Sequence, residues 1–371
     1  MHQRALRCFV FATCALLAPW LAGATSPDLT RSAEQPMFAA AGAPGMVIAV
    51  VDGDTVSIHG YGETRPGSKQ LPDAHSLLHI GSLSKLLAAD LMVKLAAQDA
   101  LRLTDPLQRY APDGMRLPVS GRPITLFDLA THTSGLPRQA DLPAGALPYA
   151  KARWIWLQQQ KTLSAPGHVA LYSNLAFDFL ADALGKAAGS TYEQALQHYV
   201  TQPLGMRDTT ATPSAEQCAR LLAGRDATPC TSASDNAGSG SMYASAADMA
   251  AWMKQQLGLG QQGVDPQTAI SQAIYFQRQS LADVQGMDHA GHADGLGLGW
   301  VLLAASAQQP AILEKTGGYG GFMSYMALAP GQKIGVFVAV TRMDLPALHA
   351  ITTQVNALVA KLTEQAHHHG A

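Results

Sequence analysis

The 371-residue chain has few charged and aromatic residues and no excess of either charge. Charged residues make up 14% of it and aromatic residues 6%, and 25 Lys and Arg residues are balanced by 27 Asp and Glu residues. Without a basic excess, we do not expect a nucleic-acid-binding protein. Because 47% of the residues are hydrophobic, an extended disordered chain is not expected either. The composition indicates a globular enzyme or binding protein with a large core.

Long apolar runs are also missing outside the N-terminus, and the run there is too short to span a bilayer stably. It extends over Cys8–Leu21, after the basic residues Arg4 and Arg7 and before Ala22-Gly23-Ala24. This order is typical of a secretory signal peptide, and a buried first helix is the alternative. We expect cleavage after Ala24, export to the periplasm and no transmembrane segment in the mature protein.

Cysteine is scarce, and beyond the signal peptide only Cys218 and Cys230 remain. An even pair in an exported protein predicts a disulfide, which closes a short loop and contributes roughly 3 kcal/mol. Two free thiols or half of a metal site are the alternatives, but no Cys or His pair lies nearby at zinc-like spacing. A second candidate metal cluster comprises Asp288, His289, His292 and Asp294. Its spacing lacks the His-Glu-x-x-His pattern, so a polar loop is preferred, and we expect no metal or other cofactor.

Strand patterns lie near both ends of the chain, and helical patterns lie between them. A hairpin is expected over residues 46–60, because two apolar runs flank the turn Asp52-Gly53-Asp54. Further strands are expected over residues 299–304, 312–316, 322–329 and 334–341, and a closing helix over 345–364. The predicted fold class is α+β: an α/β sandwich with an antiparallel sheet built from both termini, flanked by helices, and an inserted, mainly helical domain.

This pattern sets the expected domain boundaries. The signal peptide takes residues 1–24, the sheet domain 25–102 and 290–366, the helical domain 103–289, and a tail 367–371. The tail begins with three histidines, which could ligate a metal, but a flexible end is the preferred interpretation. The sequence gives no indication of the oligomeric state.

The first motif with chemical meaning is Ser82-Leu83-Ser84-Lys85, at the start of an apolar helix expected over residues 82–97. The positive end of the helix dipole favours negative charge on Ser82, and Lys85 lies one turn away on the same face. A buried lysine can lose its proton near neutral pH and act as a base toward the serine. Alone the motif is weak, because serine is a common N-cap residue.

The second motif is Tyr172-Ser173-Asn174, which precedes a predicted helix. A tyrosine held between two lysines can shuttle protons, because cations favour the phenolate, and Asn174 offers a donor and an acceptor to an amide substrate. A capping asparagine beside a core tyrosine is the alternative. Ser234-Asp235-Asn236 is a competing triplet, but it lies in a loop just after Cys230 and opens no clear helix. We therefore favour Tyr172-Ser173-Asn174.

The third motif, Lys315-Thr316-Gly317-Gly318, lies at the end of a predicted late strand. A lysine beside a hydroxyl at a sheet edge can hold a carboxylate. Glycine there lets a substrate backbone approach closely and pair as an added strand. The alternative is an ordinary turn after a strand, with no role in binding.

Each motif is weak, but the ordered set resembles the serine β-lactamase and penicillin-binding protein superfamily, and specifically its class C branch. The resemblance covers nearly the whole chain after the signal peptide, including Leu129–Pro137, Pro166-Gly167 and Gly238–Met249. Around the two cysteines and the Lys-Thr-Gly-Gly run, the chain looks most like the AmpH group of D-alanyl-D-alanine carboxypeptidase/endopeptidases.

This resemblance implies acyl transfer through a covalent serine ester. Ser82 would attack a carbonyl, Lys85 and Tyr172 would take and relay its proton, and the backbone N–H groups of Ser82 and Gly318 would hold the oxyanion. The residues implied to bind substrate are Asn174 for its amide and Lys315, Thr316 and Gly317 for its carboxylate end.

The implied substrates are peptidoglycan stem peptides in the periplasm, with binding of β-lactams and weak β-lactamase activity. Three alternatives remain open. A class C β-lactamase that hydrolyses cephalosporins would share the named residues, an esterase of the same fold would prefer small esters, and a non-catalytic penicillin-binding sensor would acylate with little turnover.

Overall fold

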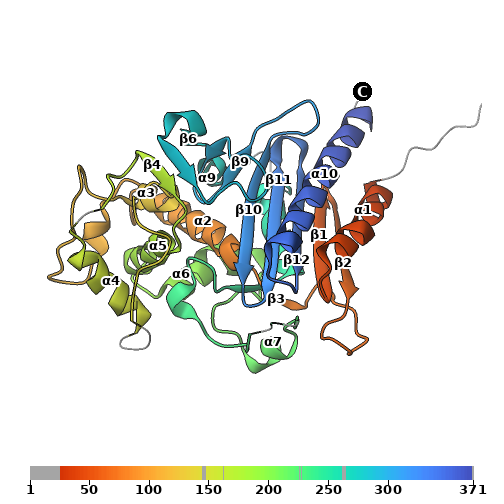
Figure 1. Ribbon diagram of the computed structural model, residues 1–371, viewed down its shortest axis with the longest axis horizontal. Helices are drawn as coiled ribbons and strands as arrows, with labels where there is room; N and C mark the ends of the chain where they lie inside the picture. Colours follow the sequence, from red (N-terminus) through yellow and green to blue (C-terminus); the bar gives the residue numbers. More distant parts are fainter. Residues whose placement is uncertain are drawn as a thin grey trace, which may run out of the picture.

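The computed structural model describes residues 26–369 apart from 144–147, 162, 225, 227 and 261–264. The predicted signal peptide lies outside the described residues. Figure 1 shows a sheet-bearing region that carries both ends of the described chain and a largely helical region beside it. No helix among the described residues has the length and apolar character needed to cross a membrane.

The main sheet is antiparallel and combines strands from the two ends of the chain. Its order is β2-β1-β12-β11-β10-β9-β8-β6. The five long strands are β1 (Gly45–Asp52), β2 (Thr55–Gly62), β10 (Ile312–Tyr319), β11 (Phe322–Ala329) and β12 (Ile334–Val340). The short ones are β6 (Phe276–Gln277), β8 (Gly295–Leu296) and β9 (Val301–Leu303). Pairing of β1 with β12, in register from Met46 opposite Val340, confirms the predicted sheet built from both termini.

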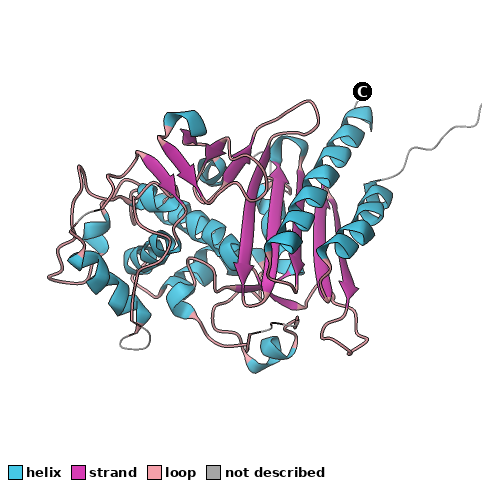
Figure 2. Ribbon diagram, viewed as in Figure 1, coloured by secondary structure: helices cyan, strands magenta, loops and turns pink. Residues whose placement is uncertain are grey.

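Both faces of this sheet are covered. Helices α1 (Ser26–Ala41) and α10 (Leu345–His369) pack together against one face, and α8 (Ala246–Gln256) packs against the other (Figures 1 and 2). Strand β1 shows why its sequence is apolar without alternation: Met46 and Ile48 enter one core and Val47 and Ala49 the other. The predicted α+β sandwich is confirmed.

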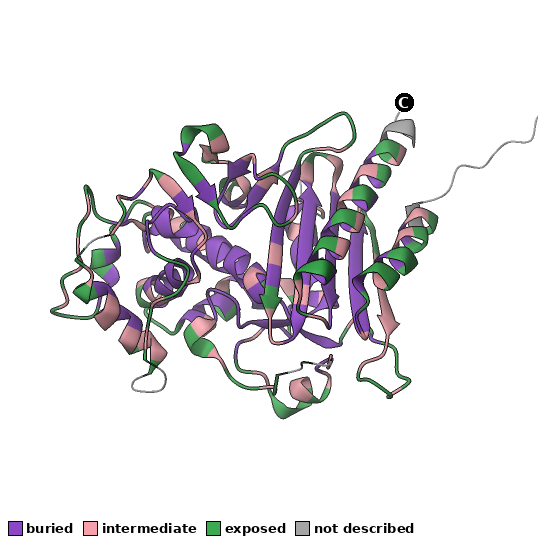
Figure 3. Cartoon of the chain, viewed as in Figure 1, coloured by how far each residue is buried: buried purple, intermediate pink, exposed green. Residues whose placement is uncertain are grey.

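Helix α2 (Ser84–Ala96) belongs to a helical region beside the sheet (Figure 1). The other helices of this region are α3 (Leu126–Ala130), α4 (Tyr149–Gln159), α5 (Asn174–Ala187), α6 (Tyr192–Leu196) and α9 (Pro266–Gln272). Helix α7 (Ala215–Ala219) lies apart from them, below the sheet. Helix α2 is buried nearly all round (Figure 3), as a helix without a polar face must be. It packs against α5 and α9, so it links the sheet region to the helical region.

Two small sheets support this junction. Strands β3 (Leu77–His79) and β5 (Tyr243–Ser245) pair antiparallel, whereas β4 (Val169–Leu171) and β7 (Asp283–Gln285) pair in parallel. The domain division at residues 103 and 290 stays a prediction. Strand β6 joins the main sheet from within the segment 103–289, where its short sequence carries no strand signal of its own.

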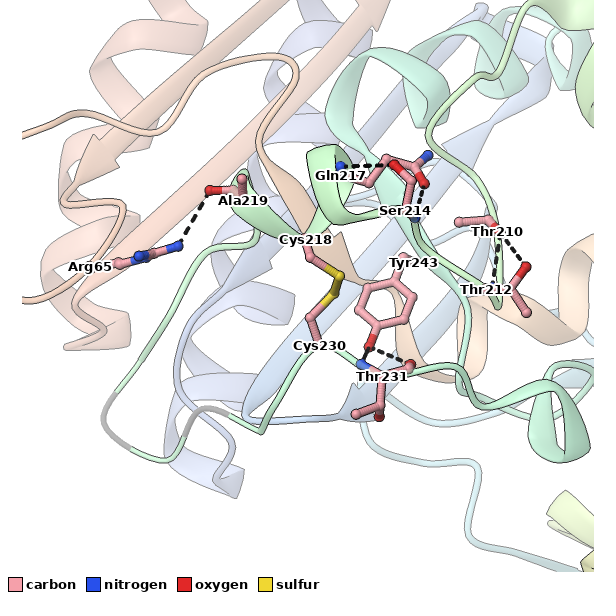
Figure 4. Close-up of a disulfide and its surroundings, with 10 residues drawn as sticks. All are labelled: Arg65, Thr210, Thr212, Ser214, Gln217, Cys218, Ala219, Cys230, Thr231 and Tyr243. Carbon is pink, nitrogen blue, oxygen red and sulfur yellow. Dashed lines mark hydrogen bonds between the residues drawn. A yellow bond between two sulfur atoms is a disulfide. The ribbon is translucent and has the colours of Figure 1, made fainter.

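The predicted disulfide between Cys218 and Cys230 is present (Figure 4). It joins α7 to the segment that leads to Thr231, whose N–H donates to the hydroxyl of Tyr243 over 3.1 Å. Tyr243 lies on β5, so the disulfide ties a surface loop to the small sheet that carries β3.

Candidate active site

Ser82 lies in a short 3-10 turn, Gly81–Leu83, that leads directly into α2. The turn approaches strand β10 closely, because a Cβ atom at Gly81 would lie 2.5 Å from the backbone nitrogen of Gly318. Gly81 also has a φ of +55°, which favours glycine. Glycine therefore lets the turn place Ser82 beside the Gly317-Gly318 backbone.

Lys85 is fully buried one turn after Ser82. Its Nζ lies 3.1 Å from Ser82 Oγ and 2.8 Å from Asn174 Oδ1, and it also donates to the carbonyl of Ser239. Burial lowers the pKa of Lys85 well below its usual value, and the charge of Lys315 acts in the same direction. A lysine that releases its proton this easily can accept one from Ser82.

Tyr172 donates a hydrogen bond of 2.5 Å to the same Ser82 oxygen. Lys315 Nζ lies 4.6 Å and Lys85 Nζ 5.0 Å from the centre of its ring, so the tyrosine does lie between the two lysines. Burial raises the pKa of Tyr172 to about 12, so the two nearby lysines do not make the phenolate the favoured form at neutral pH. Desolvation outweighs the opposing effects, and Tyr172 is a protonated donor at neutral pH.

Asn174 is the first residue of α5, and the preceding serine fixes it there. Ser173 Oγ accepts the N–H of Ala176 over 2.9 Å as an N-cap and donates to the carbonyl of Pro137 over 2.7 Å. The side-chain oxygen of Asn174 accepts from Lys85, so its NH₂ group remains as a donor for another molecule.

His132, in the segment Leu129–Pro137, supports Tyr172 from behind. The two rings stack with centroids 4.6 Å apart, and His132 Nδ1 accepts the N–H of Ser173 over 3.1 Å. Burial, followed by the nearby Lys315 and Lys85 charges, holds the pKa of His132 well below its usual value. The neutral ring is therefore a structural support for Tyr172.

Strand β10 carries Lys315, Thr316, Gly317 and Gly318 along the other wall. Strand β9 pairs with β10 only from Ile312 to Glu314, which leaves the following residues as an open edge among the described strands. Lys315 is buried, and burial lowers its pKa to about 8. The open edge can pair with an extended peptide.

A cleft of about 250 Å³ opens at this site, and the buried side chains of Lys85 and Lys315 do not line it. Of the residues predicted for the site, Ser82, Tyr172, Asn174, Thr316, Gly317 and Gly318 line it. Seven further residues line the cleft without having been predicted for this site: Arg138, Gly286, His289, Met323, Met343, Leu345 and Leu348. His289 had been considered only as a metal ligand. Only Arg138 had a signal, because it directly follows the segment Leu129–Pro137.

Buried acids behind the cleft were also missed. Asp178 lies one turn after Asn174 on α5, and burial raises its pKa to about 6. Glu314 precedes Lys315, and burial raises its pKa to about 8. The available signal for Asp178 was an apolar helix pattern interrupted by two acids, Asp178 and Asp182.

The competing triplet Ser234-Asp235-Asn236 forms a short 3-10 turn away from the serine. Its Asn236 carbonyl accepts the N–H of Gly240 over 3.0 Å, which shapes the loop that presents the Ser239 carbonyl to Lys85. Within the described chain, the side-chain hydrogen bonds of Ser82 and Lys85 go to Tyr172, Asn174 and Ser239 and to each other.

The other metal candidate does not form a cluster. Asp288 pairs with Arg278 over 2.8 Å, and His292 lies 3.9 Å from Asp288 and from Asp294. The described residues contain no group of three or more His, Cys, Asp or Glu side chains that could hold a metal ion.

A serine hydroxyl in a cleft, in contact with a buried lysine and a protonated tyrosine, is the active-site arrangement of a serine hydrolase. Residues 30–361 match the family model described as Beta-lactamase. The chain belongs to this family, and it is a serine hydrolase.

Known relatives agree with the assignment. The chain is 45% identical over 334 residues to "D-alanyl-D-alanine-carboxypeptidase/endopeptidase AmpH" of Escherichia coli K12, covering 88% of this chain and 87% of the relative. It is 26% identical to a "Beta-lactamase" of the same organism, covering 83% and 87%.

Solved structures give the same fold. A "Beta-lactamase/D-alanine Carboxypeptidase from Yersinia pestis complexed with citrate" matches with a TM-score of 0.87 and 44% identity, covering 91% of this chain and 98% of that one. A class C β-lactamase from Rhodobacter sphaeroides matches with a TM-score of 0.70 at 22% identity, covering 88% and 99%, and shows the fold alone.

Proposed function

We propose that the protein is a periplasmic serine DD-peptidase, a D-alanyl-D-alanine carboxypeptidase/endopeptidase acting on peptidoglycan stem peptides. The observation that carries the proposal is the convergence of Lys85 and Tyr172 on Ser82 Oγ, beside the open edge of β10. The 45% identity to a protein named for this activity supports the substrate class. The predicted signal peptide, cleaved after Ala24, supports the periplasmic location.

Acylation starts at Ser82. Its oxygen attacks the carbonyl carbon of the scissile amide, while its proton passes to the amine of Lys85, 3.1 Å away. Tyr172, protonated because of its raised pKa, donates its proton to the leaving nitrogen as the C–N bond breaks. Lys85 then returns a proton to Tyr172, which leaves a serine ester and a free amine.

Deacylation follows the reverse route. Water attacks the ester carbon, its proton passes through Tyr172 and Lys85, and Ser82 recovers a proton as the C–O bond breaks. The backbone N–H groups of Ser82 and Gly318 hold the oxyanion in both halves, each contributing roughly 3 kcal/mol.

Substrate orientation comes from three side chains. Lys315 and Thr316 bind the terminal carboxylate of the peptide, and the NH₂ group of Asn174 donates to the amide carbonyl of the acyl half. The peptide backbone pairs with the edge of β10 near Gly317, where a side chain would meet Ser324 and the Ile80 carbonyl.

Comparison of kcat/KM for three substrates tests this proposal: a muropeptide with a pentapeptide stem, a cephalosporin and a nitrophenyl ester. Release of terminal D-alanine as the preferred reaction is the expected result. Cephalosporin turnover near the diffusional limit of roughly 10⁸ M⁻¹s⁻¹ would show a β-lactamase instead. Preference for the ester would show an esterase, and acylation by penicillin without turnover would show a sensor.

Ser82→Ala is the control for every substrate. It should abolish covalent labelling by a fluorescent penicillin, whereas labelling that survives would contradict Ser82 as the nucleophile.

A further inference from the structure

Arg138 lines the cleft but takes no part in the chemistry described above. Its backbone is fixed, because its carbonyl accepts the N–H groups of Asn174 over 3.0 Å and Leu175 over 3.2 Å. Its guanidinium lies 5.0 Å from the centre of the Tyr172 ring. Arg138 is therefore held beside the start of α5, on the side where Asn174 faces the acyl half of the substrate.

The guanidinium of Arg138 is exposed and lacks an anionic partner. Within the described part of the chain, no ion pair and no side-chain hydrogen bond involves it. Two other arginines of the helical region are paired with carboxylates: Arg122 lies 2.6 Å from Asp128, and Arg153 lies 2.5 Å from Asp182. An exposed arginine in this cleft, on a backbone held by two hydrogen bonds, is free to bind an anion from outside.

Another part of the cleft lining is apolar. It carries Met323 on β11 and Met343, Leu345 and Leu348 after β12. In register, Met323 lies opposite Gly318 of β10, so this apolar wall lies on the sheet side of the serine. Arg138 comes instead from the segment held beside the start of α5. The two parts of the lining therefore favour different chemistry. Among the described residues that line the cleft, Arg138 is the only arginine or lysine, whereas Lys85 and Lys315 are buried beside the Tyr172 ring.

We propose that Arg138 binds a second carboxylate of the substrate, carried by its acyl half and distinct from the terminal carboxylate assigned to Lys315. The substrate class is thus an acyl donor with an acidic side chain. This proposal rests on the proposed function for the orientation of the substrate. A guanidinium can hold such a carboxylate through two parallel hydrogen bonds, which gives specificity as well as affinity.

The test uses two penicillins that differ by one carboxylate on the acyl side: benzylpenicillin and α-carboxybenzylpenicillin. The second-order acylation rate constant is measured for both with the wild-type protein, Arg138→Gln and Arg138→Lys. We expect the ratio of the two constants, carboxylated over uncarboxylated, to fall at least about tenfold in Arg138→Gln. Arg138→Lys should retain part of the ratio, because it keeps the charge without the paired donors.

Arg207→Gln is the matched control. It removes an exposed arginine from a separate cleft and should leave the ratio unchanged. An unchanged ratio in Arg138→Gln would overturn the proposal. An equal loss for both penicillins would also overturn it, because Arg138 would then act on the reaction through Tyr172 rather than on the carboxylate.

A peptide pair separates this proposal from the proposed function. N-acetylated peptides ending in D-Ala-D-Ala, with glutamate or glutamine before the terminal pair, are compared in the same variants. Cleavage of the glutamate peptide, with a preference that Arg138→Gln removes, supports both proposals. Failure to cleave either peptide contradicts the peptidase function, while the penicillin ratio still decides the role of Arg138.

Discussion

At the scale of single residues, one physical cause prepares both partners of Ser82. Burial disfavours the charged form of each group, so it lowers the pKa of Lys85 and raises the pKa of Tyr172 to about 12. Near neutral pH the lysine can accept a proton and the tyrosine can donate one. The site thus holds a base and an acid on one oxygen without a carboxylate or a histidine in direct contact with it.

Replacement of Lys85 tests this division of roles. Lys85→Ala removes the proton acceptor and should slow acylation by a fluorescent penicillin roughly 10²–10⁴-fold, the usual range for a general base. Lys85→Arg should be as slow, because a guanidinium stays protonated. The rate is measured from labelled protein against time. Wild-type labelling in either variant would show that another group takes the proton.

The pH dependence of acylation depends on Lys315. Its pKa is lowered to about 8 by burial, so it is a cation below pH 8 and becomes neutral above it. With a penicillin, which carries a carboxylate, we expect kcat/KM or the acylation rate constant to fall as the pH rises through about 8.

A neutral ester substrate is the control. Its acylation rate should not fall as the pH rises through about 8, because the ester offers no carboxylate to Lys315. In Glu314→Gln the fall in the acylation rate with penicillin should occur at lower pH, since the charge of Glu314 raises the pKa of Lys315. If the rate falls in the same way with both substrates, the titrating group acts on the reaction rather than on the substrate carboxylate.

At the scale of elements, the long strands and helices were predictable, and the shape of their ends was not. The predicted strand 312–316 continues as β10 to Tyr319, because Gly317 and Gly318 pair with Ser324 and Met323 of β11. Their glycine content alone favoured a loop. The start of the predicted helix 82–97 is a 3-10 turn instead. Both differences arise from contacts between segments far apart in the sequence, which local patterns do not report.

Gly81→Ala tests the contact between this turn and β10. The new Cβ would lie 2.5 Å from the nitrogen of Gly318, at a φ of +55°. We expect roughly 1–3 kcal/mol lower free energy of unfolding and slower labelling by penicillin, because Ser82 moves away from Gly318. Denaturant unfolding and labelling rates measure the two effects.

Gly53→Ala is the matched control, since Gly53 has a φ of +54° in the β1–β2 turn with open space around it. It carries the backbone strain without the clash and should leave labelling unchanged. Equal labelling in both variants would show that the turn tolerates a displacement from β10.

At the scale of the whole molecule, the site exists only where three distant segments meet. Ser82 and Lys85 come from the turn and start of α2, and Lys315 comes from β10. Tyr172 lies between β4 and α5, and Asn174 is the first residue of α5. The motifs and their order predicted this set through a family resemblance. The sequence could not show the distances or the apolar wall of the cleft, because the wall positions share no periodicity with the motifs. Arg138 was marked only by its place directly after Leu129–Pro137.

His79 gives a prediction about the stability of the whole fold. It is 2% exposed on β3, and neither ring nitrogen has a hydrogen-bond partner among the residues that the structure describes. Its ring centre lies 4.1 Å from that of Tyr243 and 5.1 Å from that of Tyr319. Burial lowers its pKa from 6.5 to about 4. Protonation therefore favours the unfolded chain, so the stability that His79 contributes is present above pH 6.5 and is lost as the pH falls toward 4.

His79→Phe removes this titration but keeps an aromatic ring beside Tyr243 and Tyr319. Relative to the variant, the wild-type protein should lose about 3 kcal/mol of free energy of unfolding between pH 6.5 and pH 4. Denaturant unfolding of both proteins across this range measures the difference, and the other titrating groups, including His132 and Asp178, cancel because both proteins contain them. A constant difference would mean that His79 is already solvated in the native state. Water would then reach the His79, Tyr243 and Tyr319 rings, and the β10–β11 turn would not pack closely against β3.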